Sequence, residues 1–133
     1  MSLHPLEPIP AIRRLDTNRS ALFAVEIAGH VSASDIENLY GLLEGAYALH
    51  ERIDLFIRIV DHRGVEWNAV SSKTVAEAHE HAEHHIARCV TVGDRRVTAR
   101  MARIFCPENA EHTHFESEDE AAAWAWLDAH EQA

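Results

Sequence analysis

Short apolar segments alternate with longer segments of helical periodicity along this chain of 133 residues. The short segments are rich in β-branched side chains, which favour strands, whereas the longer ones repeat apolar positions every three or four residues, which favours helices. We therefore expect five strands, at Ala11–Leu15, Leu22–Val31, Ile53–Val60, Ile86–Val92 and Glu111–Phe115.

Four helices are expected between and after these strands: from the 32–34 region to about His50, over residues 67–85, over Arg95–Phe105, and from Ser117 through Leu127. Capping residues mark three of the starts, because their side chains satisfy the free amides of a first turn. The candidates are Ser32 with Asp35 or Ser34 with Glu37, then Asp94, and finally Ser117 with Glu120.

The resulting order, ββαβαβαβα, predicts an α/β fold with a mixed, mostly parallel five-stranded sheet. Turn-forming residues 16–20 join the first two strands into a hairpin, and the later strands are joined through helices, which favours parallel pairing. The segment Ile53–Val60 is apolar apart from Asp54 and Arg58, which is typical of a strand covered on both faces. We expect an extended N-terminal segment at residues 1–10, which holds three prolines, and a single domain over residues 11–133.

The amino-acid composition of the chain limits the classes of partner that it can bind. The chain has 12 Lys and Arg against 22 Asp and Glu, so its net charge of −10 disfavours nucleic acid and anionic lipid surfaces. No apolar run is long enough for stable membrane insertion or for a signal peptide, which favours a cytoplasmic protein.

Cys89 and Cys106 lie inside apolar patterns, so we expect separate small core residues in a reducing compartment. The 11 histidines predict solubility and association that change near pH 6.

Four segments in order resemble the SpoIIAA-like family of small bacterial domains, which are related to STAS domains and, in fold, to the SEC14 lipid carriers. They are Ile27–Asp35, the strand leading to Asp61 with Gly64 and Trp67 after it, Ile86–Asp94, and Phe115 followed by Ala123–Leu127. The likeness spans about residues 11–131. It implies a β-α sheet with helices largely on one side and a family whose biochemical role is mostly unassigned.

The resemblance also bears on phosphorylation. Sporulation-type STAS regulators carry a phosphorylatable serine where a strand gives way to a helix. The matching turn here, Asp61–Gly64, holds neither Ser nor Thr, and the first hydroxyls that follow are Ser71, Ser72 and Thr74. A phosphate at Ser71 or Ser72 would be stabilised at a helix N-terminus, but a switch of the familiar type is not expected.

The His79–His85 helix carries the most conspicuous side-chain cluster. His81 and His85 are four residues apart and share a helix face, the spacing at which two imidazoles can bind one metal ion. A third ligand would have to come from elsewhere, for example His62, His112 or His114. A solvated helix face with Glu–His pairs is the alternative that we favour.

Three arginines form a stripe on the helix that Asp94 opens. Arg96, Arg100 and Arg103 follow at intervals of four and three residues. They could bind a carboxylate or phosphate, or they could be the solvent-exposed side of an amphipathic helix. Trp67 could line an apolar ligand cavity or belong to the core. Asp61, at the carboxyl end of a strand, is placed either for function or as a helix cap.

These observations predict a non-catalytic cytoplasmic binding or interaction module, with no cofactor, that forms a homodimer. Its partner would be a protein or a small apolar or anionic ligand, with Asp61, Trp67, Arg96, Arg100 and Arg103 as candidate binding residues. The five glycines are scattered and form no phosphate or dinucleotide loop. Two alternatives stay open: a SEC14-like carrier of a lipid or apolar molecule, and a metal-binding protein that uses His81 and His85.

Overall fold

A computed structural model describes residues 11–132, and the expected segment at residues 1–10 lies outside them. The elements are, in order, β1 (Ile12–Leu15), β2 (Leu22–Val31), α1 (Ala33–Leu49), β3 (Ile53–Val65), the 3-10 turn η1 (Trp67–Ala69), α2 (Ser72–His85), β4 (Ile86–Val92), α3 (Arg95–Phe105), β5 (Glu111–Phe115), the 3-10 turn η2 (Ser117–Asp119) and α4 (Glu120–Trp126). None of the helices in this part of the chain has the length and hydropathy of a membrane span.

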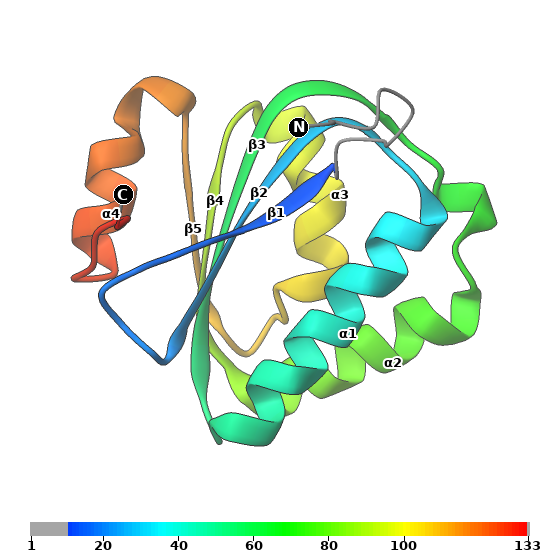
Figure 1. Ribbon diagram of the computed structural model, residues 1–133, viewed down its shortest axis with the longest axis horizontal. Helices are drawn as coiled ribbons and strands as arrows, with labels where there is room; N and C mark the ends of the chain where they lie inside the picture. Colours follow the sequence, from blue (N-terminus) through cyan, green and yellow to red (C-terminus); the bar gives the residue numbers. More distant parts are fainter. Residues whose placement is uncertain (1–10, 133) are drawn as a thin grey trace, which may run out of the picture.

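The strands form one sheet in the order β1-β2-β3-β4-β5, in which β1 is antiparallel to β2 and every later pair is parallel. Right-handed crossovers between consecutive parallel neighbours place α1, α2 and α3 on the same face of the sheet, while α4 covers the other face (Figure 1). The α/β fold with a mixed, mostly parallel five-stranded sheet is therefore confirmed.

Apolar side chains fill both sides of the sheet. The larger cluster lies beneath α1, α2 and α3 and includes Phe23, Leu43 and Phe105. The smaller cluster lies beneath α4, where the ring of Trp124 stacks on Phe56 at a centroid distance of 4.2 Å. Trp126 is only half-buried, as expected, because side chains two positions apart on a helix point in different directions.

Arg58, one of the two charged residues in the segment Ile53–Val60, joins α4 and Glu131 to the sheet through ion pairs. Its side chain is 12% exposed, and its guanidinium pairs with Glu26 at 2.8 Å, with Glu120 of α4, and with Glu131 at 3.1 Å. Burial acts to lower the pKa of Arg58, but hydrogen bonds to these carboxylates raise it overall. Asp54 on the same strand, 5% exposed, accepts from Arg19 and Arg88 in the same way.

Two element boundaries differ from the sequence prediction. Strand β3 continues past Val60 to Val65, because Val65 still pairs with Val31 beyond an irregularity at Gly29. The helix expected over residues 67–85 is wrong in its first part: η1 comes first, and α2 begins after Ser71, whose hydroxyl accepts from the amides of Lys73 and Thr74.

The predicted caps are confirmed at two helices and wrong at the third. Ser32 and Asp35 form the capping box of α1, and Asp94 accepts from the amide of Arg96 at the start of α3. Ser117 instead begins η2, and α4 starts at Glu120 with no side-chain cap.

Helix α1 holds two interior glycines, Gly41 and Gly45. A glycine inside a helix costs about 0.5–1 kcal/mol relative to alanine. A Cβ built at either position would meet no atom within 4 Å, and neither has a positive φ. Within residues 11–132, nothing that contacts α1 therefore requires glycine at these positions.

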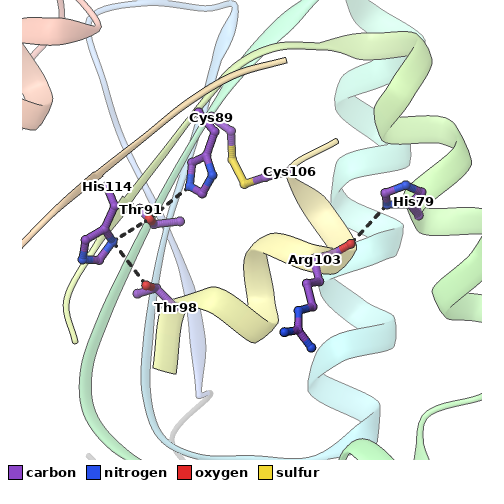
Figure 2. The surroundings of a disulfide bond; sticks show 8 residues. His79, Cys89, Thr91, Thr98, Arg103, Cys106 and His114 are labelled. Carbon is purple, nitrogen blue, oxygen red and sulfur yellow. Dashed lines mark hydrogen bonds between the residues drawn. A yellow bond between two sulfur atoms is a disulfide. The ribbon is translucent and has the colours of Figure 1, made fainter. Parts of the chain in front are cut away.

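Cys89 and Cys106 form a disulfide bond between β4 and the end of α3 (Figure 2). Both residues are buried in the core, as expected, but the expectation of separate thiols is wrong. No local pattern in the sequence points to this pairing, because it depends on the crossover that brings the end of α3 back beside β4. Disulfides persist in oxidising compartments, so the bond counts against the reducing compartment that we expected.

Replacing Arg58 with Met should lower the free energy of unfolding by about 2–3 kcal/mol, because three partly buried carboxylates lose their common cation. Arg13 offers a matched control: it pairs with the same Glu26 but is 62% exposed, so Arg13→Met should cost less than about 1 kcal/mol. Urea unfolding followed by circular dichroism measures both. Equal losses would contradict the role assigned to Arg58.

Reduction of the Cys89–Cys106 bond should lower the free energy of unfolding by about 2–3 kcal/mol, because the bond closes a loop across 17 sequence positions. Guanidinium unfolding with and without reductant measures the difference, and the Cys89→Ala/Cys106→Ala variant should not respond to reductant. Two thiols that alkylate in denatured, unreduced protein would show that the bond is absent.

Candidate functional site

The carboxyl ends of β2 and β3 and the first turns of α3 surround a surface cleft of about 330 Å³. Its floor is apolar and includes the buried side chains of Ile27, Ile59 and Met101. Polar and aromatic groups line its walls, namely His62, Trp67, Arg96 and Arg100. An apolar floor with a few polar groups around it is typical of a small-molecule site, and we call this the ligand cleft.

Gly93, between β4 and α3, holds one wall of the ligand cleft in place. Glycine adopts its φ of +137° readily, whereas residues with a Cβ rarely do. A Cβ at this position would also lie only 2.8 Å from the carbonyl oxygen of Ile59. The turn therefore runs directly against the end of β3. As a result, the first two turns of α3, with Arg96 and Arg100, stand beside the ligand cleft.

Trp67, the first residue of η1, lies on the opposite wall of the ligand cleft. Polar contacts of the preceding residue, Glu66, hold η1 in position. The carboxylate of Glu66 bonds Nε2 of His30 at 2.9 Å and accepts from the amide of Ala33, and these bonds lower the pKa of Glu66. The backbone amide of Glu66 also donates to Val31. The start of η1 is thus attached to the end of β2.

Two of the three predicted arginines belong to the ligand cleft. The guanidinium carbon of Arg100 lies 5.8 Å from the centre of the Trp67 ring, a cation–π contact between the two walls. Arg96 is 92% exposed and lies 3.5 Å from the Asp94 carboxylate. Arg103 does not line the cleft; its backbone carbonyl accepts a hydrogen bond from His79 at 3.1 Å.

Asp61 lies in a neighbouring cleft of about 420 Å³, which shares His62 with the ligand cleft. Asp94 and Ser117 also line it. Asp61 has a φ of +44°, a left-handed conformation that aspartate tolerates better than most residues. Helix α2 is capped by Ser71, so the alternative of Asp61 as a helix cap is wrong.

The histidines of α2 contact neighbouring elements. His81 pairs with Glu44 of α1 and lies 3.1 Å from the hydroxyl of Tyr40. His85 stacks on Tyr47 and donates to the carbonyl of Glu51. Within residues 11–132, no group of three or more His, Cys, Asp or Glu is arranged to hold a metal ion, so the pair His81 and His85 gains no third ligand there.

A second polar group, built from β4, β5 and α3, lies beside the disulfide (Figure 2). The buried hydroxyls of Thr91 and Thr98 lie 2.9 and 3.2 Å from Nδ1 of His114, and Nε2 of His112 lies 3.3 Å from Thr91. Partial burial, followed by the nearby charges of His114 and Arg95, lowers the pKa of His112. The group attaches β5 to α3 but lines neither of the two clefts.

His62 is the ligand-cleft residue that sequence reasoning missed as a binding residue. It follows Asp61 directly, so the rule that points to the carboxyl ends of parallel strands also points to His62. Its position between the two clefts depends on the extension of β3 beyond Val60, for which the sequence offers no pattern.

Together, the sheet order and the helices on its two faces define a small α/β domain. The chain belongs to the SpoIIAA-like family, whose model matches residues 22–128. A similar solved structure is an uncharacterized protein of the DUF3478 family, with a SpoIIAA-like fold, from Shewanella loihica PV-4. It is 23% identical, with a TM-score of 0.64 over 91% of this chain and 97% of that one. No curated protein matches the chain.

His112 should make the domain less stable in mild acid. An unfolded histidine titrates near 6.5, and the pKa of folded His112 lies below that value, so the unfolded chain binds more protons as the pH falls beneath about 6.5. The stabilisation is complete above that pH and is lost progressively below it. The variant His112→Gln should therefore lose less stability than the wild type between about pH 7.5 and 5.5.

Chemical unfolding at several pH values measures this difference between the two proteins. The histidines that do not interact with His112 contribute equally in both proteins, whereas the repulsion between His112 and His114 is part of the effect that the variant removes. An identical loss of stability in the two proteins would contradict the pKa shift.

Proposed function

We propose that this chain is a non-catalytic binding module whose ligand cleft takes a small organic anion with an aromatic or branched apolar part. The observation that carries the proposal is the pairing of Arg100 with Trp67 over the apolar floor. A guanidinium and an indole ring that face one cleft can hold a negatively charged head group and a flat apolar body at the same time.

The charges around the ligand cleft support an anionic ligand. Arg96 is already near Asp94, whereas no carboxylate in residues 11–132 lies within ion-pair distance of Arg100. On a chain with a net charge of −10, a cation that is not neutralised by its neighbours attracts anions locally. Arg100 therefore supplies the charge and Trp67 the apolar contact.

Other expectations from the sequence accompany this proposal. The absence of catalysis and the lack of a nucleic-acid partner stay predictions, as does the alternative of a carrier for a lipid or apolar molecule. The cytoplasmic location also stays a prediction, and the Cys89–Cys106 bond counts against it. A carrier of the SEC14 kind would need an enclosed apolar cavity. The ligand cleft, by contrast, is lined in part by exposed arginines, which favours a ligand with a charged end.

Naphthalene-2-sulfonate, an aromatic ring system with one negative charge, is a suitable probe for the ligand cleft. We expect it to bind and to change the fluorescence of Trp67, the tryptophan on the cleft wall. The variants Arg100→Gln and Trp67→Phe should each weaken binding, by about tenfold and about threefold, because one removes the charge and the other reduces the ring face. Isothermal titration calorimetry measures both constants.

Arg103 supplies the matched control. Arg103→Gln removes the same charge from the same helix, but Arg103 lies outside the ligand cleft, so affinity should stay within about twofold of the wild type. Equal weakening by the Arg100 and Arg103 variants would mean that the probe responds only to net charge. That result, or no binding at all, would overturn the proposal.

A further inference from the structure

Helix α1 exposes the large apolar side chains that the rest of the described surface avoids. Leu49 is 80% exposed and Leu42 is 46% exposed, and they are the exposed large hydrophobic residues among those that the structure describes. They are seven positions apart and therefore lie on one face of the helix. Exposed leucines grouped on one helix are typical of a contact surface.

The exposed positions of this face carry no charge over three turns, and the partly exposed Glu44 at its edge is paired with His81 of α2. From residue 38 to residue 49, the exposed positions of α1 are Asn38, Gly41, Leu42, Gly45, Ala48 and Leu49. We call these six residues the α1 face. About a quarter of the whole chain is charged, so an uncharged stretch of this length departs from the rest of the surface.

An open apolar groove of about 490 Å³ adjoins the α1 face. Leu42, Leu49 and the two glycines border it, and Phe23 and Ile53, from the starts of β2 and β3, form part of its lining. The groove thus lies at the amino edge of the parallel strands, whereas the ligand cleft lies at the carboxyl edge. The guanidinium of Arg14 lies over the Phe23 ring at 4.6 Å and gives the groove a basic rim.

The two glycines leave room for something outside the described chain to approach this helix closely. They destabilise α1, and a methyl group at either position would meet no atom of the described chain within 4 Å. A helix whose surface is flattened by glycine lets another backbone come near and leaves a depression for a large side chain. The glycines and the exposed leucines are separate observations that lead to the same surface.

We propose that the occupant of this surface is the α1 face of a second copy, packed antiparallel about a two-fold axis near Gly45. In such a pair, a residue that lies a given number of positions after Gly45 contacts the partner residue that lies the same number of positions before Gly45. Leu49, four residues after Gly45, then meets the partner's Gly41, four residues before it. Leu42 likewise lies opposite the partner's Ala48, so each large side chain faces a small one.

The distribution of charge favours this occupant. Glu37 is exposed near the start of α1, whereas exposed Arg14 and Arg52 lie near its end, together with Glu51. Antiparallel packing brings the acidic start of one helix to the more basic end of the other, in both halves of the pair. Two chains with a net charge of −10 repel each other, so the contact has to be formed by a surface that is neutral in its centre and complementary at its ends.

Sedimentation equilibrium over a wide range of protein concentration tests the proposal directly. We expect a reversible dimer with a micromolar dissociation constant, because a single helix pair buries less than the roughly 800 Å² per partner of a standard interface. Leu49→Glu should weaken dimerisation by at least about a hundredfold, since it places two carboxylates in an apolar contact. Ala76→Glu, which adds the same charge at an exposed position of α2, should leave it within about threefold.

The variant Gly41→Ala/Gly45→Ala separates association from simple folding effects. It should raise the thermal stability of the monomer while weakening dimerisation by at least about tenfold, because the added methyl groups stabilise the helix but keep the partner helix away. A wild type that stays monomeric at the highest concentration would overturn the proposal. So would Leu49→Glu or the double glycine variant dimerising as tightly as the wild type.

Discussion

The parallel pairing of β2, β3, β4 and β5 in the order of the chain is the constraint from which the rest of this structure follows. Each right-handed crossover returns on the same side, so three helices share one face of the sheet. The other face is left to α4, a helix of seven residues, which is short for the area that it must cover. Arg58 compensates through ion pairs with Glu120 and Glu131. Asp54 pairs with Arg19 and Arg88, whose guanidinium groups donate to the backbone carbonyls of Leu127 and Trp126.

The parallel order of the strands also determines where the ligand cleft and the α1 face lie. Three parallel strands that end together leave a shared edge, and the crossovers bring the start of α3 to that edge. Trp67 and Arg100 reach one another from elements that are 33 positions apart in the sequence. At the opposite edge, the position of α1 at the outer end of the helical layer leaves one of its faces without a covering element (Figure 1).

The sequence allowed most of the fold to be predicted, because strands and helices leave local patterns. The capping boxes, the β-branched runs and the alternation of elements each depend on residues within a few positions of one another. Contacts between distant residues leave no such pattern. Arg58 stands out in the sequence only as an irregularity, since its partners Glu120 and Glu131 are 62 and 73 positions away. The disulfide leaves no local pattern either, because it too depends on a crossover.

For the candidate site, helical periodicity identified Arg96 and Arg100 but could not exclude Arg103. A step from Arg96 to Arg103 keeps the side chain on nearly the same face of α3 while carrying it about 10 Å along the axis, away from the ligand cleft. His62 and the position of Trp67 depend on the path of β3 past Val60, where Gly29 disturbs the pairing with β2. Periodicity describes faces of elements, whereas a cleft also depends on where each element ends.

The bond between Cys89 and Cys106 encloses the whole of α3 within a covalent ring. The ring begins inside a central strand and closes just after the helix, so the wall that bears Arg96 and Arg100 is tethered at both of its ends. Fraying of the last turn of α3 is therefore restrained by a permanent link to the sheet, in addition to hydrogen bonds and packing. A surface that is pre-organised in this manner loses less entropy when it takes up a guest molecule, and so retains more of the binding energy as affinity.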